Sequence, residues 1–379
     1  MKHNTLYLAF ASALGLAVAA PTQAGVTVYK DGAKYIEIGG RLQLQYHHEN
    51  PDAGESTDEV IFRRLRPYIE GSFHKDWKAK IQFDVGKAED GNEVAIKDAY
   101  FQYKGLDNVK VTVGNANFPF SRELLTSSKR QQLVERTFVG DHNYGTPDRN
   151  AGIHLTGHSN SKKFTWGASA TSASIDPDND KLDFDTPINA NSDFNQGWMA
   201  GGRIDFHPLG YLKMSQGHFD RDKTRFTIGA GAFTWSNDDD NNSNQAGKND
   251  VDEITGLELS AALRVAGLSV DAEYNTFDAE LVQNGITDGI YENSDTTLEN
   301  FAVEGGYMLP GNQFELVAGY QSQDADNYAE EWTRSSFGAN WYLHEHKAKV
   351  QLTYRIGENL DGVDGDDADE IFLQGQFVF

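Results

Sequence analysis

The sequence predicts an all-β fold, a transmembrane antiparallel β-barrel of about 16 strands with an inward-folded third loop. Three observations support this prediction. Segments that alternate apolar and polar residues recur along the chain, the connections between them differ systematically in length, and the chain ends on an aromatic residue, Phe379. None of the later segments is apolar enough to span a membrane as a helix, and the mean hydropathy of the chain is −0.58. A mature chain that enters a membrane would therefore do so as strands.

The clearest alternating segment is Ile61–Phe73, whose residues fall on two different faces of a strand. One face is apolar and comprises Ile61, Leu65, Pro67, Ile69 and Phe73. The other face is polar and comprises Arg64, Arg66, Tyr68, Glu70 and Ser72. A soluble sandwich would bury the apolar face in its core, whereas a barrel would place it against lipid and the arginines in a water-filled lumen.

The lengths of the connections favour the barrel. About sixteen alternating segments can be traced, an even number that suits a bacterial barrel. The joins after even-numbered segments are mostly short, although residues 208–221 form a long one. The joins after odd-numbered segments are longer and rich in Asp, Asn and Gly, and the longest of them, residues 116–148, follows the fifth segment. Outer-membrane barrels have short periplasmic turns and long extracellular loops, whereas a soluble sandwich has no reason to sort its loops in this way.

The two ends of the chain indicate export to the outer membrane of a Gram-negative bacterium. Residues 1–24 combine a basic start, an apolar run and small residues before a cleavage site, which is the pattern of a secretory signal peptide cleaved after Ala24. Residues 25–379 are then a single barrel domain. The last segment, Ala368–Phe379, alternates up to its terminal aromatic residue and must pair with the first segment, because lipid tolerates no open edge.

Composition and motifs exclude several functions. The chain has no cysteine, and its formal net charge of −24 makes it a poor partner for nucleic acid. No nucleophile elbow, zinc-protease motif or phosphate-binding loop is present, so we expect no enzyme, no catalytic residue and no cofactor. The His344–Glu345–His346 turn has no third ligand within reach in the sequence, so we expect no metal site.

The most informative group of residues consists of lysines and arginines. Residues 25–150 contain 18 Lys and Arg against 19 Asp and Glu, whereas residues 151–379 contain 14 against 38. The long third loop carries several bases in Ser121–Phe138, which we expect to form a short helix capped near Ser127 or Ser128. The candidate pore-lining and anion-binding residues are Arg63, Arg64, Arg66, Lys78, Lys80, Arg122, Lys129, Arg130, Arg136, Arg203, Arg225 and Arg355. Fixed positive charge in a narrow lumen concentrates anions. The alternative is that these bases pair with lumen acids such as Glu70, Asp84 and Asp98 and only stiffen the wall.

Several stretches resemble the phosphate-selective porins O and P of Gram-negative bacteria. The resemblance is carried by GGRLQLQY (39–46), FRRLRPYIEG (62–71), KDWKAKIQFDV (75–85), DAYFQYKG (98–105), VTVGNANFPF (111–120), LLTSSKRQQLVERTF (124–138), GANWYLHEHKAKVQLTYR (338–355) and LQGQFVF (373–379). The resemblance implies a sixteen-stranded barrel, a homotrimer in contact with outer-membrane lipid and lipopolysaccharide, and passive diffusion of small hydrophilic solutes such as phosphate or polyphosphate. It also places an FRR pair, here Arg63 and Arg64, at the constriction, although the period-two count puts Arg63 outward.

Two positions differ from the phosphate-selective members of that family. Leu124 stands where they carry a lysine before the TSS motif, and the middle loop, residues 175–195, has one base, Lys181, where they have a ladder of arginines. A general or cation-preferring diffusion porin is therefore the main alternative. A barrel adhesin or a barrel enzyme is a further one.

Overall fold

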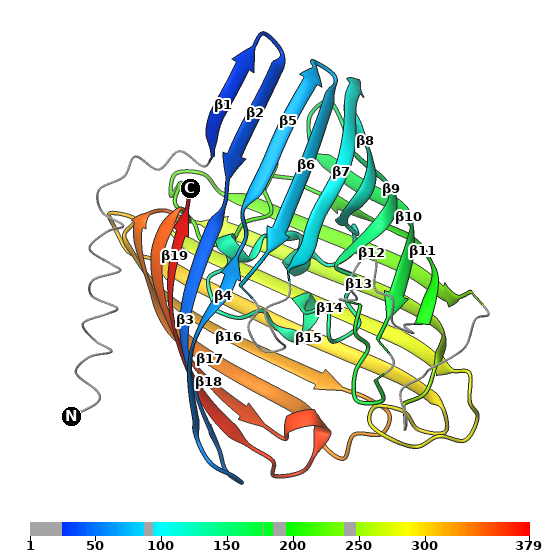
Figure 1. Cartoon of the computed structure of the whole chain (residues 1–379). Helices are drawn as coiled ribbons and strands as arrows, with labels where there is room; N and C mark the ends of the chain where they lie inside the picture. Colours follow the sequence, from blue (N-terminus) through cyan, green and yellow to red (C-terminus); the bar gives the residue numbers. More distant parts are fainter. Residues whose placement is uncertain (1–24, 87–93, 177, 185–194, 239–247) are drawn as a thin grey trace.

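The computed structural model describes residues 25–86, 94–176, 178–184, 195–238 and 248–379. The predicted signal peptide, residues 1–24, lies outside them. The described chain is all-β, with nineteen strands in one antiparallel sheet (Figure 1). The strands are β1 (Val26–Asp31), β2 (Lys34–Gly39), β3 (Arg41–Pro51), β4 (Thr57–Leu65), β5 (Tyr68–His74), β6 (Trp77–Asp84), β7 (Ala95–Leu106), β8 (Val109–Asn117), β9 (Arg149–His158), β10 (Phe164–Ile175), β11 (Asn195–Phe206), β12 (Arg225–Asn237), β13 (Val251–Val265), β14 (Leu268–Leu281), β15 (Asp295–Met308), β16 (Phe314–Asp324), β17 (Trp332–His344), β18 (Ala348–Glu358) and β19 (Ala368–Val378).

Neighbouring strands follow one another in chain order. Each strand from β5 to β19 pairs with the next, and the last strand, β19, pairs with β3 from Val378 opposite Arg41 to Ala368 opposite Pro51. The predicted pairing of the terminal segment with the first is therefore present. Among the described residues, no helix has the length and apolarity that a membrane crossing requires.

The number of strands is nineteen rather than about sixteen, and the extra strands have local causes. β1 precedes the first predicted segment and pairs with β2. Gly40 separates β2 from β3, and Arg66 and Pro67 separate β4 from β5. Proline has no N–H to donate to a neighbouring strand, which explains an interruption at Pro67.

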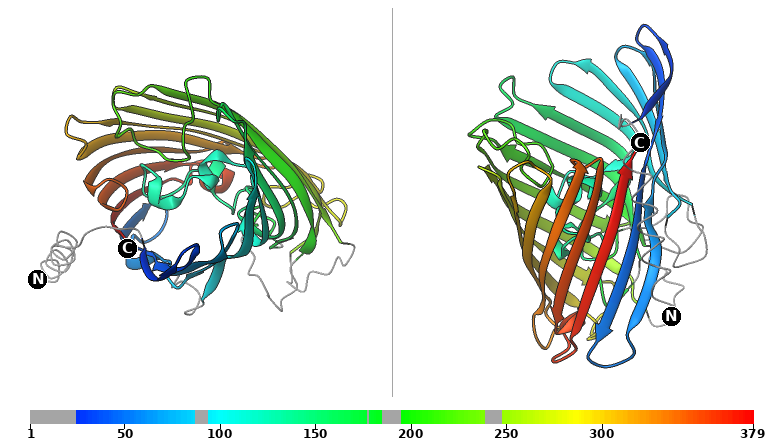
Figure 2. Two further views of the ribbon diagram at one scale, coloured as in Figure 1. Left: turned by 90° about the horizontal axis from the view of Figure 1, so that it is seen from above. Right: turned by 90° about the vertical axis from the view of Figure 1, so that its left-hand side faces the viewer.

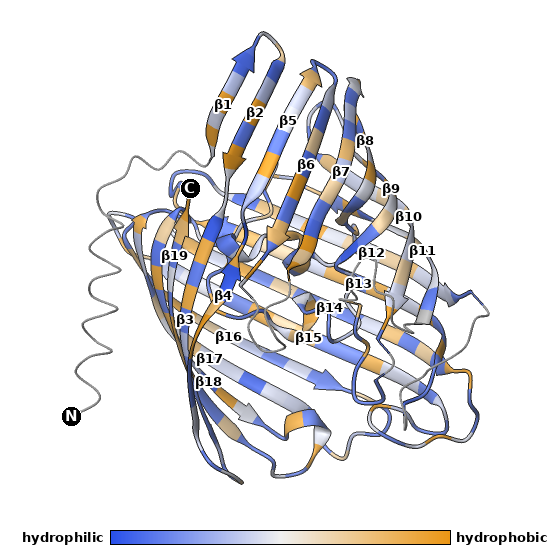
Figure 3. Cartoon of the chain, in the orientation of Figure 1, coloured by the Kyte–Doolittle hydropathy of each residue, from blue (hydrophilic) through white to orange (hydrophobic). Residues whose placement is uncertain are grey.

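The two faces of the sheet differ as a period of two predicts. In β13, Leu257 and Leu259 are 59% and 63% exposed, whereas Glu258 between them is 1% exposed. Apolar and polar residues alternate in the same way along other strands (Figure 3). The apolar residues cover the outer face, and the polar residues face the interior.

A β-bulge in β4 overturns part of the predicted face assignment. Gln43 lies opposite Arg64 and Gln45 opposite Ile61, so Phe62 and Arg63 share one position across from Leu44. This extra residue shifts the alternation. Ile61 consequently lines an interior cavity instead of facing outward with Phe73, and Phe62 is exposed on the outside.

The connection between β8 and β9 folds into the interior, where the strands curve around it (Figure 2). It contains the helix α2 (Arg122–Leu125) and the 3₁₀ turns η1 (Ser128–Arg130) and η2 (Phe138–Gly140). The hydroxyl of Ser121 caps α2 by accepting the N–H of Leu124 at 3.1 Å. The predicted cap near Ser127 or Ser128 is wrong, since Ser127 only precedes η1 and makes no capping hydrogen bond.

An apolar cluster holds the start of this loop against the sheet. Phe118 and Phe120 are fully buried against Phe233, at ring-centroid distances of 6.1 and 5.0 Å. Phe120 also contacts Phe277 of β14. Since aromatic burial removes a large apolar area from water, this cluster fixes where the loop crosses the interior.

Candidate functional site

Three cavities lie in series along the interior, and the inward-folded loop contributes to all of them. We call them the intermediate cavity, of about 330 Å³, the narrow cavity, of about 100 Å³, and the large cavity, of about 500 Å³. Arg63 and Glu135 line both the intermediate and the narrow cavity, and Arg149 lines both the narrow and the large one. The narrow cavity therefore adjoins both of the wider ones.

The bulge in β4 brings two arginines to one carboxylate at the narrow cavity. Arg63 Nε and Nη2 donate to the two oxygens of Glu135 at 2.9 and 3.1 Å. Arg64 Nη2 lies 3.9 Å from Glu135, and Arg64 Nη1 donates to Gln43 at 3.3 Å. The expectation that Arg63 faces outward is therefore wrong, because the extra residue of the bulge turns both side chains inward.

Glu135 is ionised in this arrangement. Burial opposes its ionisation, but the charges of Arg63 and Arg64 outweigh burial and hold the pKa of Glu135 at about 2. The narrow cavity thus contains a negative charge that partly neutralises its arginines.

Within the described part of the chain, eight of the candidate bases form ion pairs, as the alternative interpretation anticipated. Arg63 and Arg64 contact Glu135, Arg66 contacts Asp84, and Lys78 contacts Glu70 at 2.5 Å. The remaining pairs are Lys80 with Asp98 at 2.6 Å, Arg122 with Asp271 at 3.1 Å, Arg203 with Asp205 and Glu258 at 2.8 and 2.6 Å, and Arg355 with Glu370 at 2.5 Å. These bases stiffen the wall, and their charge is largely neutralised locally.

Two further candidates have other roles. Arg136 donates to four backbone carbonyls, those of Glu123, Leu124, Thr126 and Gly140, at 3.0 to 3.2 Å. It therefore holds the loop in its folded path. Arg225 lies at the start of β12, donates to the adjacent Thr224 carbonyl at 2.8 Å and lines none of the three cavities.

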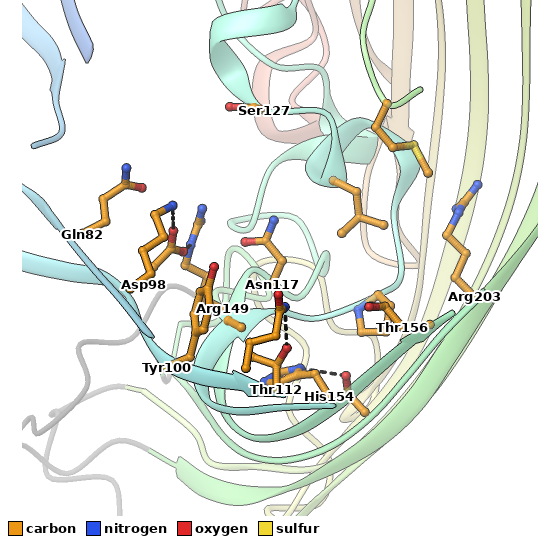
Figure 4. Close-up of a pocket in the computed structure, with 18 of the residues that line it drawn as sticks. Gln82, Asp98, Tyr100, Thr112, Asn117, Ser127, Arg149, His154, Thr156 and Arg203 are labelled. Atoms are coloured by element: carbon orange, nitrogen blue, oxygen red, sulfur yellow. Dashed lines mark hydrogen bonds and ion pairs between the residues drawn. The ribbon is translucent and has the colours of Figure 1, made fainter. Parts of the chain in front are cut away.

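Lys129 and Arg130 of the loop meet Arg41 of β3 at the large cavity. Arg41 Nη1 donates to the hydroxyl of Ser127 at 3.1 Å, and its buried Nε has no hydrogen-bond partner among the described residues. Ser127 lines the cavity from the loop, whereas Asp98 and Arg149 lie on one side of the cavity and Arg203 lies on the other (Figure 4). Within the described ranges, Lys129 and Arg130 form no ion pair with a carboxylate.

Repulsion between neighbouring cations affects the pKa of Lys129. Burial and the neighbouring charges of Arg41, Arg130, Lys80 and Lys213 lower the pKa of Lys129 to about 8. These four neighbouring charges are all cations. An anion that entered the large cavity would relieve this repulsion.

Sequence reasoning missed Arg41, Lys213 and Arg149. Arg41 stands two and four residues before Gln43 and Gln45, which are both buried, so the period-two count was sufficient to place it inward. Lys213 belongs to the irregular connection between β11 and β12, where alternation gives no orientation. Among the described residues, no group of three or more His, Asp or Glu side chains is placed to bind a metal.

The comparisons with known proteins agree with this architecture. A model of the family described as phosphate-selective porin O and P matches residues 36–377. Porin O of Pseudomonas aeruginosa is 25% identical over an alignment that covers 100% of this chain and 99% of that protein.

Solved structures show a similar fold. An anion-selective porin from Comamonas acidovorans has a TM-score of 0.59 at 12% identity, covering 91% of this chain and 100% of that one. The trimer form of OmpT from Vibrio cholerae has a TM-score of 0.57 at 13% identity, covering 91% and 99%. These relatives indicate an outer-membrane porin, a channel rather than an enzyme. This chain belongs to the phosphate-selective porin O and P family.

Proposed function

We propose that this porin passes small hydrophilic solutes by passive diffusion and prefers anions of the phosphate or polyphosphate class. The observation that carries the proposal is the cluster of Arg41, Lys129 and Arg130, whose cations have no carboxylate partner in the described chain beside the large cavity. Fixed positive charge in a narrow lumen raises the local concentration of anions. The family description and the name of the anion-selective Comamonas porin support the same direction.

The mechanism requires no movement of the wall. Solutes diffuse from the intermediate cavity through the narrow one, where Arg63 and Arg64 retain excess positive charge over Glu135. They then reach Arg41 and the Ser127 hydroxyl, which can donate hydrogen bonds to phosphate oxygens. The size of the narrow cavity sets the upper limit on the solute.

We further propose a closed barrel of sixteen strands that assembles as a trimer. Counting β2 with β3 and β4 with β5 as single strands, and leaving β1 outside the ring, turns nineteen strands into sixteen. The continuous pairing from β19 to β3 supports closure, and the OmpT trimer supports the oligomeric state. The apolar outer face would contact lipid, with the acidic loops next to lipopolysaccharide.

A general or cation-preferring porin is the second candidate. The net charge of −24 and the eight ion-paired candidate bases favour it. Reversal potentials in a salt gradient across a planar bilayer separate the two functions. Preference for cations by the wild-type protein would refute the anion filter, and absence of discrete conductance steps would refute the channel.

Replacing Arg64 with alanine is expected to lower the anion-to-cation permeability ratio by about threefold or more, because one charge at the constriction is worth at least about 0.7 kcal/mol to an ion about 6 Å away. Arg225→Ala is the matched control, since Arg225 lines none of the cavities. Reversal potentials of both variants provide the measurement. An unchanged ratio in the Arg64 variant would show that the constriction lies elsewhere.

Anion preference is expected to fall as the pH rises through about 8. Lys129 has a pKa of about 8, so it is charged below this pH and neutral above it. Burial raises the pKa of Glu123 in the same loop to about 8, and its ionisation acts in the same direction. Reversal potentials of the wild type and of Lys129→Gln between about pH 6 and 9.5 separate the two groups, since the variant lacks Lys129 but keeps Glu123. The slope should be smaller in the variant, and equal slopes would contradict the assignment to Lys129.

A further inference from the structure

Residues 208–221, which we call the 208–221 segment, form a second insertion into the interior. They connect β11 to β12, although neighbouring antiparallel strands need only a short turn, as Ala266–Gly267 shows between β13 and β14. The segment follows Phe206, which pairs with Phe164 at the start of β10, next to the end of β9. The inward-folded loop instead joins the start of β9, so the two insertions leave the sheet at opposite ends. Leu212, Gln216 and His218 of the segment are buried.

Gln216 lies where the two insertions meet, and all of its polar groups are used. Its N–H donates to the Arg130 carbonyl at 3.0 Å, and its Oε1 accepts the N–H of Gln132 at 2.7 Å. Its Nε2 donates to Glu304 at 2.5 Å, and its carbonyl lies 2.9 Å from Nε2 of His346. Gln216 therefore contacts the inward-folded loop on both sides of Gln131. It also connects this loop to β15 and to the turn after β17.

The neighbours of Gln216 in the 208–221 segment also bind the wall. The Ser215 carbonyl accepts from Arg264 at 2.8 Å, and the Gly217 N–H donates to Ser269 at 3.1 Å. Nδ1 of His218 accepts the N–H of Gly267 at 3.1 Å. The segment is thus a rigid support, and the Arg130 carbonyl that it holds belongs to η1, the turn that carries Lys129 and Arg130.

We propose that Gln216 is a positioning residue for the anion filter. The 208–221 segment would support η1 from one end of the barrel interior, whereas the inward-folded loop that contains η1 enters from the other end. Gln216 fixes the backbone on which Lys129 and Arg130 stand, so it determines where their charge lies in the large cavity. Lys213, exposed on the same segment, adds a further cation beside this turn. This inference rests on the proposed anion preference of the pore.

Gln216→Ala removes the partners of the Gln132 N–H and of Glu304 without changing the charge of the pore. In a planar bilayer we expect greater open-channel current noise and a lower anion-to-cation permeability ratio, because η1 loses its support. Ser215→Ala is the control, since within the described residues the Ser215 hydroxyl donates a single hydrogen bond, to the Gln216 carbonyl at 3.3 Å. Heat-modifiable migration in detergent gels verifies folding. A folded Gln216→Ala protein with wild-type noise and selectivity would overturn the proposal.

A second pair of variants tests the position of the segment without disturbing packing. Lys213→Gln is expected to lower the permeability ratio, whereas Lys223→Gln, which removes an exposed lysine paired with Asp220 at the far end of the connection, is expected to leave it unchanged. Equal effects of the two variants would overturn the proposed position of Lys213. A wild-type channel without anion preference would refute the proposed function instead, and the noise of Gln216→Ala would then still report on the support of η1.

Discussion

Replacing Lys129 and Arg130 together with glutamine is expected to remove most of the anion preference of the channel. At a distance of about 6 Å, a unit charge contributes between about 0.7 kcal/mol at a dielectric constant of about 80 and about 2.8 kcal/mol at about 20. A free-energy difference of about 1.4 kcal/mol changes an equilibrium ratio about tenfold. Each charge removed should therefore lower the anion-to-cation permeability ratio by about threefold to hundredfold. The effect should be large because these two charges have no carboxylate partner in the described chain. Reversal potentials in a salt gradient measure it.

The matched control removes the same number of charges far from the cavities. Lys30 and Lys34 are exposed in the β1–β2 hairpin, and Lys30→Gln with Lys34→Gln should leave the permeability ratio unchanged. A similar fall in both double variants would mean that the total charge of the chain, rather than the charge at the large cavity, sets the preference. A wild-type ratio in the Lys129 and Arg130 double variant would exclude these residues from the filter.

Replacing Glu135 with glutamine is expected to act in the opposite direction and raise the anion-to-cation permeability ratio. Glu135 is ionised, since its pKa is about 2, and it neutralises part of the charge of Arg63 and Arg64 at the narrow cavity. Its removal adds one net positive charge at the constriction, which by the same Coulomb estimate corresponds to about threefold to hundredfold. Single-channel conductance in phosphate should rise together with the ratio.

Glu59→Gln provides the comparison, because Glu59 lines the intermediate cavity with its side chain 36% exposed and pairs with His47. We expect only a small change in that variant, since water screens an exposed charge. Heat-modifiable migration should establish that the Glu135 variant is folded. A lower ratio in folded Glu135→Gln would show that Glu135 orients the arginines rather than opposing them.

The inward position of many bases was predictable from alternation, but their partners were not. Lys80 and Asp98 face inward by the period-two count, yet the sequence contains no information that Asp98 also accepts a hydrogen bond from Arg149. These contacts join adjacent strands whose registers depend on the whole sheet. For this reason the sequence left filtering and structural pairing open for every candidate base, and the structure separates the paired Arg66 from Lys129 and Arg130.

Two errors came from assuming a regular strand and a regular helix. One extra residue near Arg63 reversed the predicted faces of Ile61 and Arg63 but not those of Arg64 and later residues, and no local residue signals that bulge. In the loop, both Ser121 and Ser127 precede short helical turns, and only the former caps a helix. Which serine serves as the cap depends on where Phe118 and Phe120 anchor the chain, which is a tertiary contact.

The sequence by itself determined the all-β class, the two-faced strands, the inward loop and the family, because each of these depends on local alternation, connection length or short motifs. Only the tertiary structure decided which cations remain without an acid, since that outcome depends on distances between strands and insertions far apart in the chain. Arg41, Lys129 and Gln216 illustrate the difference. Each is unremarkable in its local sequence, and they are brought together by two segments that enter the interior from opposite ends.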